Sequence, residues 1–402
     1  MFYQLKKTIR ANTSFYTALL KCGKAARMIL CNVIIMFCGI ENKAVFQSFN
    51  GKQYSCNPRA ISEELHRRQP DMKIVWLFRN PEEKKKIAPD YVHCLKIGTF
   101  KALYENLTAK FWVDNFEKPL DTIKRKEQVY IQTYHSDRCF KKKLYDSPFI
   151  TKNTKFIESE ICDLAISGSD FADKLFKTAF HYTGEIQKYG CPRNDILVRN
   201  DSEKAGAIKK QLNIEENTKI LLYAPTMRRE ASNKYALQPL GEIDLIATIK
   251  ALEEKTAKEW VCLVRAHSAV KGLSGIPSDL VKIIDVTTYE DMCDMLLISD
   301  FLITDYSSSA GDFALLGRPI ILFQADRDDY IKHDRTFYFD MDKSPYKIVQ
   351  DQHGLVKMIE NMDWDIIPQN CKEILSFFGT TETGRASEKV VEYMLAKQKQ
   401  IS

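Results

Sequence analysis

The feature that most restricts the fold of this chain is an alternation of short apolar runs and amphipathic stretches after residue 43. Such alternation is typical of buried parallel strands connected by covering helices. In the first half, the expected strands are Ala44–Phe49, Lys73–Phe78, Lys110–Val113, Val129–Thr133 and Asp163–Ser167. In the second half, they are Lys219–Tyr223, Trp260–Val264, Val281–Asp285, Phe301–Thr304 and Ile320–Phe323.

Helices are expected to begin near Asn57, Thr99 and Ser169, each close to a capping residue, and to cover 241–254, 290–298 and 308–316. A chain of 402 residues suits two domains better than one. The polar segment 198–217 is the expected crossing between them. We therefore predict an α/β protein of GT-B architecture, in which two Rossmann-like domains face each other across a cleft at the strand carboxyl ends.

The N-terminal segment, residues 1–42, differs from the rest in charge. Residues 1–40 hold six bases and no acid, which accounts for the whole net charge of +6. One helical face would carry Phe2, Leu5, Ile9, Tyr16 and Leu20. The next apolar run, Met28–Ile40, is shorter than the roughly 20 residues that span a bilayer. We predict a retained, basic amphipathic segment on an anionic membrane surface, or alternatively a helix that only covers the first domain.

Other sequence features exclude several classes of protein. The neutral body disfavours a nucleic-acid partner, and eleven scattered cysteines without a Cys-x-x-Cys pair favour a reduced, intracellular protein. Neither a Walker loop nor a Gly-x-Gly-x-x-Gly motif is present. The carboxylates at 326–329 and 291–294 lack a partner histidine, so we predict no metal and no other cofactor.

A cluster of hydroxyl groups follows the expected strand Phe301–Thr304. The sequence continues as Asp305-Tyr-Ser-Ser-Ser309 before the expected helix Ala310–Leu316. Free backbone amides and the hydroxyls of Ser307, Ser308 and Ser309 would form a pocket for a diphosphate. A simple serine helix cap is the alternative.

Two other strands of the second half end in polar residues. Lys219–Tyr223 leads to Thr226 and Arg228, and Trp260–Val264 leads to Arg265 and His267. The two arginines could neutralise phosphate oxygens, and His267 could donate a hydrogen bond to one. Taken separately, each is also compatible with a surface salt bridge.

In the first half, Val129–Thr133 ends in Tyr134-His135-Ser-Asp137-Arg138, followed by Lys141 and Lys142. A histidine just past a buried strand is a candidate general base for an acceptor hydroxyl. The cations that follow it could guide an anionic acceptor. A hydrogen-bonded structural histidine and a solvated lysine run are the alternatives.

Over residues 44–395 the chain resembles the CDP-glycerol glycerophosphotransferases, which prime or polymerise teichoic acids and related capsule polymers. The motifs are Ser48-Phe-Asn-Gly-Lys-Gln-Tyr-Ser-Cys-Asn-Pro-Arg-Ala-Ile61, Gly190-Cys-Pro-Arg-Asn-Asp195, Leu222-Tyr-Ala-Pro-Thr226, Leu296-Leu-Ile-Ser-Asp300, Thr304-Asp-Tyr-Ser-Ser308, Arg318-Pro-Ile-Ile321 and Gly384-Arg-Ala-Ser-Glu388. The resemblance implies a GT-B fold at the cytoplasmic face of a bacterial membrane. It also implies transfer of glycerol phosphate from CDP-glycerol to a lipid-linked acceptor, with release of CMP.

By this resemblance, His135 and His267 fall at the two catalytic histidines, and donor-binding motifs contain Thr226, Arg228, Asp305, Ser307 and Ser308. The predicted domains are an acceptor domain at 43–198, a donor domain at 199–375 and a C-terminal helix at 376–402 that packs back on the first.

The family usually has Trp-His-Gly-Thr-Pro where this chain has Tyr134-His-Ser-Asp-Arg138, so the acceptor-side loop is altered. Ribitol phosphate is an alternative to glycerol phosphate. A nucleotide-sugar glycosyltransferase and an inactive membrane scaffold are alternative functions.

Overall fold

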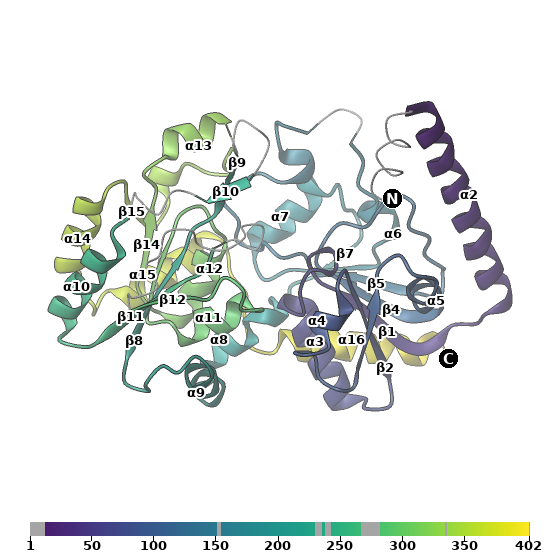
Figure 1. Ribbon diagram of the computed structural model, residues 1–402, viewed down its shortest axis with the longest axis horizontal. Helices are drawn as coiled ribbons and strands as arrows, with labels where there is room; N and C mark the ends of the chain where they lie inside the picture. Colours follow the sequence, from purple (N-terminus) through teal and green to yellow (C-terminus); the bar gives the residue numbers. More distant parts are fainter. Residues whose placement is uncertain are drawn as a thin grey trace, which may run out of the picture.

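The computed structural model describes residues 13–150, 154–229, 235–237, 243–266, 282–333 and 336–401. Two lobes, each built around a parallel sheet, lie next to each other (Figure 1). The α/β, GT-B-like fold expected from the sequence is confirmed.

The first lobe contains a seven-stranded parallel sheet of order β3-β2-β1-β4-β5-β6-β7. Its strands are β1 Glu41–Gln47, β2 Lys73–Phe78, β3 Val92–Lys96, β4 Ala109–Asp114, β5 Val129–Gln132, β6 Leu164–Ile166 and β7 Glu185–Gln187. Its helices are α3 Cys56–Arg68, α4 Pro81–Lys84, α5 Phe100–Thr108, α6 Glu158–Ile161 and α7 Asp170–Ala179. All residues of β4 are buried, as expected for a strand covered on both faces.

The second lobe contains a six-stranded parallel sheet of order β12-β11-β8-β13-β14-β15. Its strands are β8 Lys219–Ala224, β11 Trp260–Val264, β12 Ile283–Asp285, β13 Phe301–Thr304, β14 Ile320–Phe323 and β15 Lys347–Val349, and a separate antiparallel pair consists of β9 Met227–Arg229 and β10 Tyr235–Leu237. Its helices are α8 Asp195–Arg199, α9 Ser202–Gln211, α10 Leu245–Thr256, α11 Met292–Ile298, α12 Ser309–Phe313, α13 Arg327–His333, α14 Gln352–Glu360 and α15 Ile367–Phe377.

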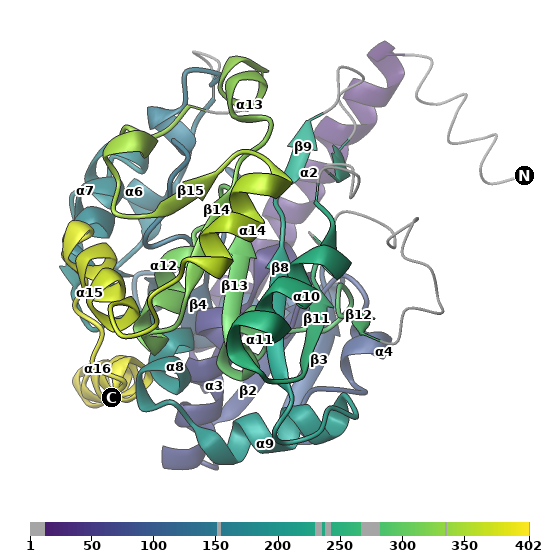
Figure 2. The same cartoon turned by 90° about the vertical axis from the view of Figure 1, so that its left-hand side faces the viewer.

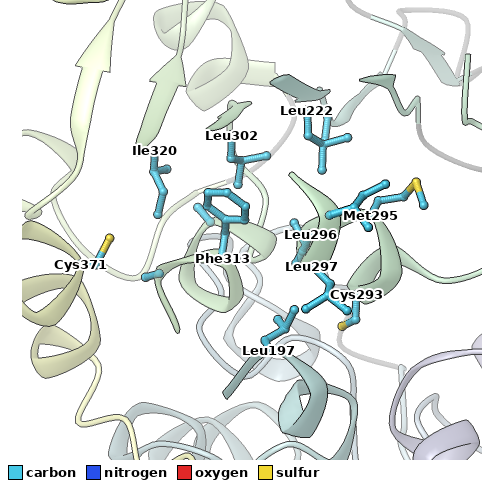
Figure 3. Packing of buried hydrophobic residues seen from close by; sticks show 14 of the residues in the cluster. Leu197, Leu222, Cys293, Met295, Leu296, Leu297, Leu302, Phe313, Ile320 and Cys371 are labelled. Atoms are coloured by element: carbon cyan, nitrogen blue, oxygen red, sulfur yellow. The ribbon is translucent and has the colours of Figure 1, made fainter. Parts of the chain in front are cut away.

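The two faces of the second sheet have separate cores. Leu222 of β8 packs with Leu296 and Phe313 on the side of α11 and α12 (Figure 3), whereas Leu221 packs on the side of α10 and α14. This alternation follows from the period of two along a strand. The carboxyl ends of β8, β11 and β13 lie at one edge of the sheet, because β11 and β13 both pair with β8 in parallel.

Two segments connect the lobes. The last helix, α16 Ala386–Ile401, runs beneath the first sheet (Figure 1), where Val390 and Met394 belong to the first lobe's core. In the other direction, Phe140 packs in the core of the second lobe, and its carbonyl accepts a 2.8 Å hydrogen bond from the Tyr338 N–H. Each lobe therefore buries side chains from a segment that also contacts the other lobe.

The helix α2, Thr13–Phe37, lies along the outer side of the first lobe (Figures 1 and 2). Cys31 and Ile34 pack against Leu107 near α5. Five large apolar side chains on the remaining surface of α2 are exposed, namely Met28, Ile29, Val33, Met36 and Phe37. In the part of the chain that is described, no helix has the length and apolar character needed to cross a bilayer. Of the predicted amphipathic face, Phe2, Leu5 and Ile9 lie outside the described residues.

The sequence-based boundaries differ from the structure mainly at short elements. The strands β3, β7, β9, β10 and β15 were not predicted, and the expected helix Ala310–Leu316 is the five-residue α12 followed by a 3-10 turn, Ala314–Leu316. Four of the missed strands, β7, β9, β10 and β15, have three residues each, too few to show a clear apolar period.

Candidate active site

A cavity of about 370 Å³ lies between the two lobes, at the carboxyl ends of both sheets. The first-lobe wall includes Asn50, Lys52, Arg79 and His135, and the second-lobe wall includes Thr226, Arg265, Ser307 and Ser308. Residues from two distant parts of the sequence, 50–135 and 226–308, therefore line the same cavity. In open α/β sheets, this edge is where ligands bind.

The position of His135 is set by its neighbours. Tyr134, which follows the end of β5, has a φ of 46°, so the chain turns sharply before the histidine. The imidazole Nδ1 lies 2.8 Å from the backbone carbonyl oxygen of Asn115, and the rings of Phe49 and Phe116 lie 5.2 and 5.9 Å away. Because a carbonyl oxygen only accepts, Nδ1 carries the proton of this bond. In the neutral imidazole, the basic lone pair is then on Nε2.

The three serines differ in accessibility. Ser307 and Ser308 are partly exposed in the cavity, whereas Ser309 is buried and its hydroxyl donates to Ser307 Oγ at 2.9 Å. Ser307 and Ser308 therefore present hydroxyl groups at the second-lobe wall. Ser309 also borders the cavity, but its hydroxyl is used by Ser307.

Asp305 positions this wall from inside the protein. It is 2% exposed, and its two carboxylate oxygens accept from the Thr226 N–H at 2.9 and 3.0 Å. The same carboxylate accepts from Arg228 Nη1 at 2.8 Å. Asp305 thereby joins the ends of β8 and β13 and fixes the direction of Thr226, without reaching the cavity itself.

Arg228 and Arg265 have different surroundings. Arg228 pairs with Asp305 and Asp326 and lies 5.0 Å from the ring of Tyr306, behind the cavity lining. Arg265 lines the cavity, and its guanidinium donates to the carbonyl of Tyr289 at 2.7 Å. Burial lowers the pKa of Arg265, and within the described residues it makes no ion pair. Arg265 is therefore the arginine whose charge is available to a phosphate, while Arg228 organises the wall.

The acceptor-side interpretation of Asp137 and Arg138 needs correction. Arg138 is 0% exposed and donates to Asp312 at 2.5 Å and to Glu382 at 3.0 Å. Asp137 accepts from the Gly168 N–H at 2.7 Å. Such burial contradicts direct contact between Arg138 and an acceptor in the cavity. The extra charge pair of this loop instead forms a buried ionic cluster that joins the lobes.

Lys141 and Lys142 also lie away from the cavity lining. The Lys142 N–H donates to the Thr336 carbonyl at 2.8 Å, and Lys141 Nζ lies 5.9 Å from the centre of the Tyr330 ring. Both lysines therefore contact second-lobe residues outside the cavity lining. His267 lies outside the described residues, so its role stays a prediction, as do the roles of the other predicted site residues.

Lys52 and Arg79 of the first-lobe wall were not predicted from the sequence to have a role in the site. The available signal was Asn50-Gly51, which follows the end of β1 after two residues and is a dipeptide that favours a left-handed turn. Among the described residues, no group of three His, Cys, Asp or Glu side chains is arranged to bind a metal ion.

Comparison with known proteins supports the resemblance. Residues 32–396 match the family described as CDP-Glycerol:Poly(glycerophosphate) glycerophosphotransferase. The teichoic acid poly(glycerol phosphate) polymerase of Bacillus subtilis (strain 168) is 33% identical over 86% of this chain and 48% of its own length. The teichoic acid glycerol-phosphate transferase of Staphylococcus aureus is 33% identical over 88% of this chain and 92% of its own.

A solved structure of the wall teichoic acid polymerase TagF matches with a TM-score of 0.80 at 28% identity, and the match covers 100% of both chains. The chain spans about half the length of the Bacillus subtilis relative and nearly all of the Staphylococcus aureus one. The motifs, the fold and these matches agree. The chain belongs to the CDP-glycerol:poly(glycerophosphate) glycerophosphotransferase family.

Proposed function

We propose that this protein transfers a polyol phosphate, glycerol phosphate from CDP-glycerol, to a hydroxyl of a membrane-linked acceptor and releases CMP. The product would be a teichoic acid or capsule-type polymer. The observation that carries this proposal is the cavity shared by His135 of the first lobe and by Thr226, Arg265, Ser307 and Ser308 of the second. A TagF variant has been soaked with CDPG, and its fold matches this one.

The chemistry follows from the two walls. His135 Nε2 takes the proton of the acceptor hydroxyl, and the oxygen attacks the β-phosphorus of CDP-glycerol. The bond from that phosphorus to the oxygen bridging the two phosphates breaks, and CMP leaves with the bonding electron pair. Arg265 and the hydroxyls of Ser307 and Ser308 would stabilise the negative charge on the diphosphate oxygens. Catalysis would rest on positioning and charge stabilisation.

We also propose that the protein is peripheral to the cytoplasmic face of the membrane. The exposed apolar face of α2 supports this, since Met36 is 74% and Phe37 77% exposed. Six bases and no acid precede residue 41, a composition that is attracted to anionic lipids. Apolar contact and charge would then both contribute to membrane binding.

Purified protein tests the proposed reaction. CDP-glycerol, CDP-ribitol and a nucleotide sugar are each supplied with a lipid-linked acceptor on anionic vesicles, and the product mass is measured. We expect CMP release and a mass increase of one glycerol phosphate per event. Transfer of a sugar would favour the glycosyltransferase hypothesis, and absence of turnover with every donor would favour the scaffold.

A further inference from the structure

The loop after β1 adopts an unusual backbone conformation beside His135. Phe49, Asn50 and Gly51 have φ values of 46°, 55° and 73°, so three consecutive residues are left-handed. A Cβ on Gly51 would lie 3.0 Å from the Leu77 carbonyl oxygen, closer than side chains ordinarily approach. Left-handed conformations of non-glycine residues cost free energy and persist where the surroundings enforce them, often at functional sites.

Specific hydrogen bonds hold this loop. Arg79 donates its backbone N–H to the Gly51 carbonyl and its Nε to the Asn50 carbonyl, both at 2.8 Å. Asn115 Oδ1 accepts from the Phe49 N–H at 2.8 Å, and the Asn115 carbonyl is the partner of His135 Nδ1. The loop, Arg79 and the histidine are therefore positioned relative to one another through Asn115.

The loop places two cations at the first-lobe wall. Lys52 and Arg79 are exposed and line the cavity, and neither forms an ion pair within the described residues. The Nε of Arg79 is used by the Asn50 carbonyl, which leaves its two terminal nitrogens as donors toward an anion.

The carboxylates at the cavity lining do not neutralise these cations. Asp291 accepts from the Cys56 N–H at 3.0 Å and lies 3.5 Å from Arg59. Asp312 pairs with Arg193 at 3.0 Å and with Arg138. The two acids are thus committed to other partners, and the first-lobe wall has excess positive charge.

We infer that Lys52 and Arg79 form a binding site for a phosphate of the acceptor, the phosphodiester that precedes the reacting hydroxyl. The identity of the acceptor as a polyol phosphate rests on the proposed function. In such a chain the terminal hydroxyl is only a few bonds from its phosphodiester. A phosphate held by an arginine and a lysine in the cavity that contains His135 would bring that hydroxyl to the imidazole.

Ligand binding tests this site without requiring turnover. Isothermal titration of the full chain uses a short soluble oligo(glycerol phosphate) and, as a matched uncharged ligand, oligoglycerol. We expect the wild type to bind the phosphate oligomer only, with an affinity that falls as salt rises. K52A and R79A should each weaken binding about tenfold, because each removes a charge-assisted contact. K96A, at the exposed end of β3 outside the cavity lining, should bind like the wild type.

Kinetics then separates the site from the proposed reaction. In K52A and R79A we expect KM for the acceptor to rise about tenfold while KM for CDP-glycerol stays within about twofold, and K52R should recover part of the loss. Equal affinity of the wild type for both oligomers, or unchanged binding in K52A and R79A with unchanged melting temperatures, would overturn the site. A wild type that binds the phosphate oligomer but releases no CMP would contradict the proposed function and leave the site supported.

Discussion

The Nδ1 of His135 and the backbone carbonyl of Asn115 are 2.8 Å apart, which fixes the imidazole with its basic nitrogen on the opposite edge of the ring. Because a main-chain carbonyl provides this contact, substitution of the Asn115 side chain would not remove it. Replacement of the histidine itself is therefore the direct test of its role.

His135→Ala is expected to reduce turnover by about 10² to 10⁴-fold while CDP-glycerol affinity stays nearly unchanged, since a general base acts on the acceptor. CMP release gives the rate, and donor titration gives the affinity. H66A is a suitable control, because His66 stacks on Tyr91 away from the cavity. A parallel loss of donor binding in His135→Ala would contradict the assignment.

Asp305→Asn should raise KM for CDP-glycerol and destabilise the fold by about 3 kcal/mol, because it leaves the charge of Arg228 less compensated at a buried position. Urea unfolding measures the second effect. Asp326, the other partner of Arg228, is 19% exposed in its side chain, so Asp326→Asn should cost less. An equal loss of unfolding free energy in the two variants would show that the burial of the carboxylate does not determine the loss.

Arg138→Met removes the cation of the buried cluster and leaves Asp312 and Glu382 close together. We expect a loss of about 3–5 kcal/mol in the free energy of unfolding. Arg67→Met breaks a salt bridge to Glu64 at an exposed position and should lower the free energy of unfolding far less, because water screens such a pair. Denaturant unfolding of both variants gives the comparison. If Arg138→Met lowered the free energy of unfolding only slightly, this would contradict the role of Arg138 in joining the lobes.

Glu117 provides a pH-dependent contribution to stability. Burial, with a further effect of Glu158, raises the pKa of Glu117 to about 7. Because the folded-state pKa lies above the unfolded value of about 4.3, folding favours the protonated acid. Its stabilising contribution is therefore complete below pH 4.3 and is lost as the pH rises through 7.

Glu117→Gln should accordingly be more stable than the wild type at pH 8, and this difference should shrink toward pH 5. Urea midpoints measured between these values follow the trend. A constant difference across this range would show that Glu117 does not titrate there.

The double variant Ile29→Ser/Phe37→Ser should bind anionic vesicles at least about tenfold more weakly, because each buried apolar side chain contributes roughly 1.5–3 kcal/mol. Vesicle flotation measures the bound fraction. Ile366→Ser, an exposed apolar position in the second lobe, serves as the control. Undiminished flotation of the double variant would place the attachment elsewhere.

Apolar runs and strand-end polar residues were enough to predict five strands of each sheet and the residues of the second-lobe wall. Ser307, Thr226 and Arg265 each follow a central buried strand, and neighbouring strand ends meet at one edge. The sequence therefore contained the information needed to bring them together.

The first-lobe wall was harder to predict. Arg138 follows a strand end just as Arg265 does, yet it is buried because Asp312 and Glu382, more than 170 positions away, close over it. Lys52 faces the cavity because three left-handed residues turn the chain before it. A local pattern of polar residues does not show which distant acids will pair with an arginine. It also does not show which residues will adopt a left-handed backbone conformation.

Transfer of label from CDP-[¹⁴C]glycerol to a lipid-linked acceptor, quantified together with CMP, tests the central claim most directly. The account predicts one labelled glycerol phosphate on the acceptor for each CMP released by the wild type, and almost none of either with His135→Ala. CMP release without acceptor labelling, or equal labelling by His135→Ala, would contradict it.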